Sequence, residues 1–160
     1  MTKTLTDELR QAGDPALAEH YRRFLQTAPG EYGEGDVFIG LKVPQIRKIT
    51  LKHAADYRLK DIETLLTDPY HEIRLAALML MMKRFEKADK DEQRQLFELY
   101  LRRLPFINNW DLVDMAAPAV VGAYCYPDAA PLRKLADSGH LWSERTAVVS
   151  CLYFIRRNHC

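Results

Sequence analysis

The chain has 160 residues, which is long enough for one domain with a hydrophobic core. Its 23 Lys and Arg residues nearly balance its 22 Asp and Glu residues, which excludes a strong overall attraction to nucleic acid or membranes. Basic residues are nevertheless concentrated in residues 42–60 and 131–160, and a near-neutral protein can still carry a basic face.

Apolar residues recur with the period of an α-helix in almost every segment, as in the stripe of Leu75, Leu78 and Met79. The sequence lacks alternating apolar and polar runs long enough for strands. Several expected helices begin at or near a proline, whose missing N–H costs little in the first turn. We therefore expect an all-α fold, with helices over residues 3–12, 15–27, 43–55, 59–67, 70–86, 90–104, 109–124, 128–137 and 141–156.

The glycine-rich stretch "APGEYGEGDVFIG" (28–40) lies between two expected helices. It matches neither of the common glycine-rich phosphate-binding motifs, so we interpret it as a loop with positive-φ turns. Its aromatic residues, Tyr32 and Phe38, either pack under the loop or form an exposed contact.

A faint internal repeat links "LLTDPYHEIRLAAL" (65–78) to "LADSGHLWSERTAVV" (135–149). Arg74 and Arg145 lie about 70 residues apart, twice the period of roughly 35 residues that suits HEAT or armadillo helix pairs. We therefore expect a curved solenoid whose concave face carries Arg74, Asp114 and Arg145. The alternatives are an irregular helical bundle and, for Arg74, an ion pair with Glu72 or Glu63.

Cysteine, histidine and hydropathy patterns indicate a cytoplasmic protein without a cofactor. The three cysteines are odd in number and have no CxxC spacing, which favours reduced thiols. The five histidines form no recognisable ligand pair, so we expect no metal. The N-terminus has acidic residues where a signal peptide would be apolar, and the apolar run at 76–82 is too short to cross a bilayer.

The segment "INNWDLVDMAAP" (107–118) combines an indole, an acid and a proline at helical spacing. Trp110 and Asp114 are four residues apart and so share one side of a helix. Pro118 has no N–H for the carbonyl of residue 114, so we expect a kink there. The kink either re-aims Asp114 or lets the helix follow the curve of the stack.

Four segments, "GEGDVFIGLKVPQIRK", "HEIRLAALML", "NNWDLVDMAAP" and "LWSERTAVV", occur in an order and spacing that resemble the AlkD-like DNA alkylation repair family. The resemblance covers nearly all of the chain and implies a single helical-repeat domain over residues 1–160. It implies a cofactor-free DNA glycosylase that removes cationic purines, such as 3-methyladenine and 7-methylguanine, from double-stranded DNA. It also implies that the chain is shortened, because relatives continue into further helices that supply a second lesion-facing tryptophan.

By the same resemblance, Trp110, Asp114 and Arg145 correspond to the active-site residues of the family. Loss of a cationic base gives the sugar oxocarbenium character, so an ionised Asp114 could stabilise the sugar and orient the attacking water. The electron-rich ring of Trp110 could attract the cationic sugar or base. Arg145 could hold a phosphate, or instead pair with Glu144 or with an acid of a neighbouring repeat.

Three further residues, Trp142, Arg156 and Arg157, are candidates for DNA contacts. The alternatives are packing for Trp142 and plain solvation for the two arginines. For the whole chain, which we expect to be a monomer, the alternative function is a non-catalytic HEAT-like module that binds DNA or a protein. The acid discriminates between the two functions, because phosphate binding gains nothing from a carboxylate in the cleft.

Overall fold

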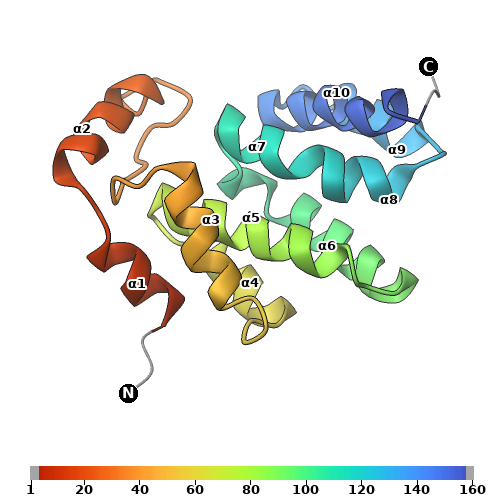
Figure 1. The fold of residues 1–160 in the computed structure, drawn as a ribbon. Helices are drawn as coiled ribbons and strands as arrows, with labels where there is room; N and C mark the ends of the chain where they lie inside the picture. The colour runs from red at the N-terminus through yellow and green to blue at the C-terminus, as the bar shows by residue number, and fades with distance from the viewer. Residues whose placement is uncertain (1–3, 158–160) are drawn as a thin grey trace. The chain divides into compact units, whose positions relative to one another are not determined.

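A computed structural model of the protein describes residues 4–157, and these residues fold as helices joined by mostly short connections, with one long loop over residues 25–42 (Figure 1). Within this part of the chain there is no β-strand, only an isolated bridge between Val37 and Tyr70. The all-α class is therefore confirmed. The chain divides into two compact units, residues 1–80 and 81–160, with the boundary inside one helix. The single repeat domain and its curvature stay predictions.

The first unit begins with two capped helices. Thr4 and Asp7 form a reciprocal capping box at the start of α1, and Asp14 accepts hydrogen bonds from the first turn of α2, just before Pro15. The helices of this unit are α1 (Leu5–Gln11), α2 (Pro15–Phe24), α3 (Val43–Lys52), α4 (Leu59–Leu65) and the start of α5 (His71–Phe85). All five lie within the predicted ranges.

Helix α5 supplies a large part of the core of this half of the chain. Every residue from 71 to 81 is buried, which includes the predicted stripe of Leu75, Leu78 and Met79. A helix buried on all sides needs its polar side chains paired internally, because unpaired buried polar groups are costly. The first turn of α5 contains such buried polar side chains, and they are paired inside the protein.

Glu72, in that first turn, clamps the glycine-rich loop to α5. Its carboxylate accepts backbone hydrogen bonds from Ile39 (2.9 Å), Gly40 (2.8 Å) and Leu41 (3.4 Å) while only 2% of the residue is exposed. Gly40 has a φ of +87°, and a Cβ there would lie 1.9 Å from the carbonyl oxygen of Asp14. The clamp and this close approach fix the end of the loop, so the prediction of a loop with positive-φ turns is confirmed.

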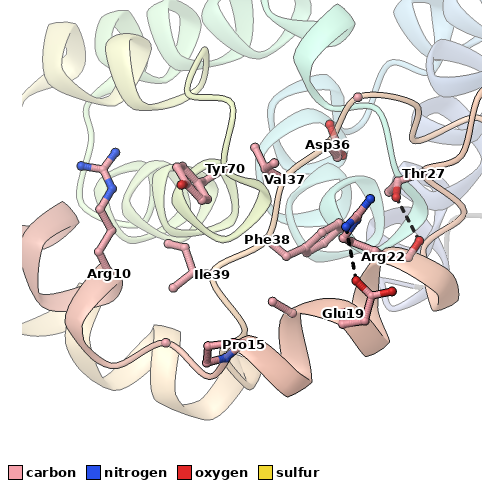
Figure 2. Close-up of a pocket in the computed structure, with 13 residues that line it drawn as sticks. Arg10, Pro15, Glu19, Arg22, Thr27, Asp36, Val37, Phe38, Ile39 and Tyr70 are labelled. Carbon is pink, nitrogen blue, oxygen red and sulfur yellow. Dashed lines mark hydrogen bonds and ion pairs between the residues drawn. The ribbon is translucent and has the colours of Figure 1, made fainter.

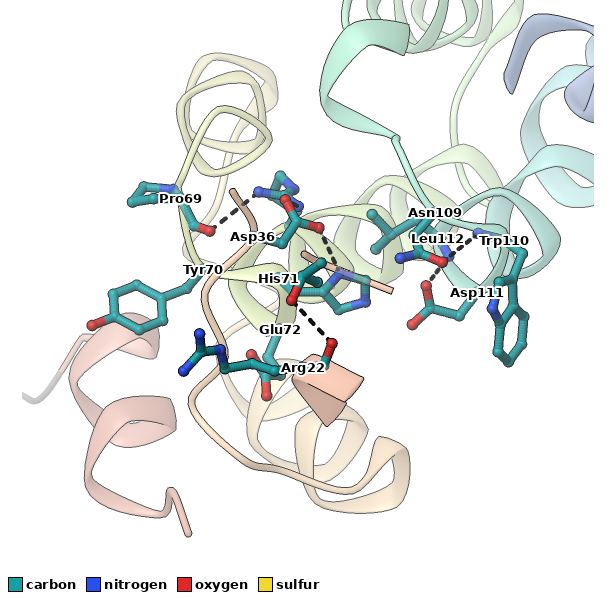
Figure 3. Close-up of polar contacts among 12 residues, drawn as sticks. Arg22, Asp36, Pro69, Tyr70, His71, Glu72, Asn109, Trp110, Asp111 and Leu112 are labelled. Carbon is teal, nitrogen blue, oxygen red and sulfur yellow. Dashed lines mark hydrogen bonds and ion pairs between the residues drawn. The ribbon is translucent and has the colours of Figure 1, made fainter. Parts of the chain in front are cut away.

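The prediction that Arg74 lines a surface is wrong. Arg74 is only 4% exposed, and its Nη2 pairs with Asp36 at 2.8 Å. Its Nη1 donates to the carbonyls of Asp68 and Pro69, at 2.9 and 3.3 Å, so both terminal nitrogens of the guanidinium have partners inside the protein. Asp36 also lies 3.4 Å from Nδ1 of His71 (Figure 3). Asp36, an acid in the loop, is thus a partner of Arg74 that the sequence analysis did not name.

The aromatic residues of the loop differ in burial. Phe38 is 8% exposed, and its ring packs on that of His71 with centroids 4.9 Å apart. This confirms packing under the loop for Phe38, whereas Tyr32 is half-buried.

The second unit contains α6, α7, α10 and the segments between them. A π-helical segment, η2, follows α7 directly, so the predicted helix 109–124 is divided into three parts. The elements are α6 (Lys90–Arg102), the 3₁₀ turn η1 (Leu104–Phe106), α7 (Trp110–Ala116), η2 (Ala117–Gly122), α8 (Ala123–Cys125), α9 (Ala130–Ala136) and α10 (Leu141–Ile155).

Pro118 accounts for the change from α to π geometry. Its nitrogen cannot donate to the carbonyl of Asp114, so the α-helical pattern is interrupted and wider turns follow. The kink predicted at Pro118 stays a prediction, as do the two alternatives for its purpose, and the structure shows a change of helix type at this point.

Helix α10 packs along α7 and η2 and sets the position of the predicted site (Figure 1). At Gly122 the two backbones are so close that a Cβ would lie 2.5 Å from the carbonyl oxygen of Ser150. Ser150 Oγ also donates to the carbonyl of Ala117 at 3.1 Å, which satisfies a buried acceptor of η2. The hydroxyl oxygen of Tyr100, on α6, lies 3.3 Å from the hydroxyl oxygen of Thr146, on α10, in the buried interior.

Across residues 4–157, no helix has the length and apolar character needed to span a membrane.

Candidate active site

The start of α7 is fixed by a buried asparagine. Asn109 is fully buried, has extended backbone geometry, and accepts a hydrogen bond from the backbone N–H of Trp110 at 2.9 Å (Figure 3). Trp110 is therefore the first residue of the helix, Asp111 lies in its first turn, and Asp114 follows one turn after Trp110. The half-buried Trp110 and the exposed Asp114 thus share a helix side, as predicted.

Arg145 of α10 holds both carboxylate oxygens of Asp114. Its Nε donates to Oδ1 at 2.8 Å, and its Nη2 donates to Oδ2 at 2.7 Å. This side-on, bidentate arrangement is the strongest geometry for an arginine–carboxylate pair. The acid that pairs with Arg145 thus comes from α7, which matches the alternative of an ion pair with a neighbouring element. The phosphate role predicted for Arg145 stays a prediction.

The Asp114–Arg145 pair is open to solvent. The side chains are 38% and 40% exposed, whereas those of the Asp36–Arg74 pair are 6% and 5% exposed. Pairs at this exposure contribute only about 0–1 kcal/mol to stability, because water screens the attraction. Asp114 is therefore held in a defined orientation without being buried, and it stays accessible to a substrate.

The remaining predicted DNA contacts differ in accessibility. Trp142 is 8% exposed, so its indole contributes mainly to the core, in line with the packing alternative. Arg156 is exposed at the end of α10. The guanidinium of Arg157 stacks on Tyr153, 3.5 Å from the ring centroid, and lies 5.7 Å from the centroid of Tyr126. Contacts of these residues with DNA stay predictions.

The two described cysteines are free thiols in different environments. Burial raises the pKa of Cys125 to about 11, with a further contribution from Asp128. Cys151 is exposed on α10, and Cys160 lies outside the described residues. A thiol with a raised pKa is a poor nucleophile, because the thiolate is the reactive form.

A cleft of about 740 Å³ in the first unit lies between α2 and residues 35–39 (Figure 2). Arg10 and Tyr70 lie at one end, and Glu19 and Arg22 lie at the other. Its lining includes none of the predicted site residues. Asp114, by contrast, lies on an exposed part of α7. Among residues 4–157 there is no group of three or more His, Cys, Asp or Glu side chains that could hold a metal ion.

Three residues that organise the molecule were missed in the sequence. Asp36 and Glu72 act through contacts more than 30 positions away in the chain, for which local periodicity has no signal. Asn109 could have been found, because an asparagine directly before an apolar helix is a common N-cap.

Comparison with protein families matches residues 5–160 to the DNA alkylation repair enzymes. The chain therefore belongs to the DNA alkylation repair enzyme family. A comparison with curated proteins finds no match to the chain.

Proposed function

We propose that the protein is a DNA glycosylase that hydrolyses the N-glycosidic bond of cationic alkylated purines in double-stranded DNA. Membership of a DNA alkylation repair family supports a damaged-DNA substrate. The observation that carries the proposal is the exposed, oriented carboxylate of Asp114, one turn after Trp110 on α7. A protein that only binds phosphates would gain nothing from an acid at that position.

The chemistry that we propose for this site requires no strong base. A purine alkylated at N3 or N7 is already cationic and leaves as a neutral base, so the transition state places positive charge on the deoxyribose. Asp114 stabilises that charge electrostatically and orients the water that attacks C1′. The C1′–N bond breaks, the water oxygen bonds to C1′, and the released proton passes to solvent. Trp110 presents an aromatic ring to the same cationic centre.

Other parts of the protein support binding and location. Arg156, at the end of α10, and the neighbouring Arg157 would contact phosphates, which position DNA without reading its sequence. A DNA substrate and free thiols at Cys125 and Cys151 fit a cytoplasmic protein. No metal or organic cofactor takes part in the proposed steps.

The direct test is product identity. Duplex DNA with a single 7-methylguanine is incubated with the full chain, and free modified base and abasic sites are measured against undamaged duplex. We expect equal amounts of free 7-methylguanine and abasic site from the damaged duplex alone. Tight DNA binding without base release would support the alternative, a non-catalytic helical module. Unmodified guanine in the repaired strand would instead indicate transfer of the alkyl group to the protein.

A further inference from the structure

The ion pair between Asp114 and Arg145 joins the carboxylate that the proposed function uses to the arginine for which the sequence predicts a phosphate contact. Each of the two carboxylate oxygens accepts a hydrogen bond from the same guanidinium, at 2.8 and 2.7 Å. In the protein without DNA, the negative charge of Asp114 is therefore balanced by Arg145. A balanced carboxylate stabilises a cationic sugar less well than an unbalanced one.

An external anion can reach the Asp114–Arg145 pair, as a comparison with the Asp36–Arg74 pair indicates. The Asp36–Arg74 pair is buried, and its guanidinium also donates to two backbone carbonyls, so an external anion has no access to it. The Asp114–Arg145 pair joins side chains that are 38% and 40% exposed. Its attraction is weakened by water, and an incoming anion can reach it.

A DNA phosphate is a suitable competitor for Arg145. It offers two anionic oxygens with a spacing that matches the planar fork of a guanidinium, as the carboxylate does. Duplex DNA also presents phosphates at high local density beside any bound protein. When a phosphate accepts the hydrogen bonds of the Arg145 guanidinium, the charge of the Asp114 carboxylate is no longer balanced. This carboxylate then lies next to the sugar that adjoins the phosphate.

We propose that Asp114 and a DNA phosphate compete for Arg145, so that DNA binding itself releases the carboxylate for catalysis. The inference rests on the proposed function, since it assumes that DNA binds at α7 and α10. It assigns Arg145 two successive partners, the carboxylate in the free protein and a phosphate in the complex. The ion pair with Arg145 balances the charge of the Asp114 carboxylate until DNA binds.

A double-mutant cycle on DNA affinity tests the competition. Dissociation constants for an undamaged duplex are measured at 50 mM salt for wild type, Asp114→Asn, Arg145→Gln and the double variant. We expect Asp114→Asn to tighten binding by about two- to fivefold in the wild-type background, because the competitor for Arg145 is gone. When Arg145 is already replaced by glutamine, Asp114→Asn should increase the affinity for DNA no more than the removal of any other nearby negative charge does.

Asp111→Asn is that matched control, because it removes the same charge from the same helix. Its effect on affinity should be equal in both backgrounds. The competition is overturned if Asp114→Asn changes affinity equally with and without Arg145, or if it weakens binding. If Arg145→Gln does not fold, Arg145→Lys takes its place, because lysine keeps the charge and lacks the fork.

The cycle and the proposed function can fail independently. Affinity for undamaged DNA involves no base release, so coupling without release would keep the competition and remove the glycosylase. Base release without coupling would keep the glycosylase and remove the competition. Absence of any DNA binding by the wild type would overturn both.

Discussion

At the scale of single residues, environment separates groups that share the same chemistry. Asp36 and Asp114 both pair with an arginine, but the first pair is buried and serves the fold, while the second is solvated and available. The cysteines divide in the same way, because Cys125 is buried and Cys151 is exposed. Exposure therefore tells which of several similar side chains can meet a substrate.

The two thiols should differ strongly in reactivity. With a pKa of about 11, Cys125 holds about one thiolate in a thousand at pH 8, and its burial also blocks access. We expect a maleimide to modify Cys151 in the folded protein and to leave Cys125 unmodified until the chain is unfolded in urea. Peptide mass spectrometry after timed labelling measures both positions. Rapid labelling of Cys125 in the native protein would contradict its burial.

At the scale of elements, α5 is held to the glycine-rich loop by one carboxylate, and α1 is held to α3 by another. Glu72 accepts three backbone N–H groups of residues 39–41. Glu8 of α1 lies 3.3 Å from Nζ of Lys52 in α3 and 3.2 Å from Nε2 of His53 directly after it. Glu72 fixes the position of residues 39–41, and Glu8 fixes α1 against α3. Local helix propensity does not determine either position.

The Glu72 clamp predicts a large cost for a small substitution. Glu72→Gln keeps the size of the side chain but loses the charge and one acceptor oxygen, and it puts two N–H donors in a buried site. We expect a loss of about 2–3 kcal/mol in the free energy of unfolding, measured with urea. Glu34→Gln is the matched control, because Glu34 accepts one backbone N–H in an exposed turn and should change stability by less than about 0.5 kcal/mol. Equal effects at the two positions would contradict the clamp.

The α1–α3 contact predicts a dependence of stability on pH. The hydrogen bond from Lys52 is the main cause that holds the pKa of Glu8 below its ordinary value of 4.5, against an opposing effect of desolvation. A lowered folded-state pKa means that the stabilisation is complete above pH 4.5 and is lost as the pH falls through the folded-state pKa.

Wild type should therefore be more stable than Glu8→Gln near neutral pH, and the difference should shrink on acidification below pH 4.5. Urea unfolding of both proteins over a pH series measures this difference. Glu98→Gln, on the exposed side of α6, is the control and should follow the wild type throughout. A difference that grows toward low pH would have the wrong sign for a lowered pKa.

At the scale of the whole molecule, the sequence was sufficient for the class and order of the helices. The predicted helix 141–156 agrees with the observed Leu141–Ile155 of α10, although the apolar residues Val148, Leu152 and Ile155 that suggested it are exposed. The predicted helix 109–124 was interrupted because Pro118 removes a donor, and periodicity cannot indicate the π geometry that follows. Partners far apart in the chain, such as Arg74 and Asp36, depend on tertiary packing and left no local signal.

The candidate site was predictable in its members and not in its contacts. Spacing placed Trp110 and Asp114 on one side of a helix, and family resemblance selected Arg145. That Arg145 meets Asp114 itself could not be predicted, because the pairing depends on how closely α10 packs on α7 and η2. The burial of Trp142 also depends on that packing.

Binding through phosphates predicts a steep dependence on salt for the whole protein. The three phosphate contacts proposed for Arg145, Arg156 and Arg157 give a slope of about −2.7 in log affinity against log salt, so affinity for duplex DNA should fall about 40-fold between 50 and 200 mM. Arg156→Gln and Arg157→Gln should each flatten that slope by about 0.9. Arg94→Gln, which changes an arginine of α6 paired with Asp91, is the control. A flat slope for the wild type would contradict the phosphate contacts.

The most direct test of the account is the rate of base release under single-turnover conditions, with protein in saturating excess over duplex that carries 7-methylguanine. Saturation removes differences in DNA affinity, so the rate reports the hydrolysis step. We predict that Asp114→Asn lowers this rate by about 100-fold or more, while Asp111→Asn stays within about twofold of the wild type. An unchanged rate for Asp114→Asn would show that this carboxylate does not take part in hydrolysis.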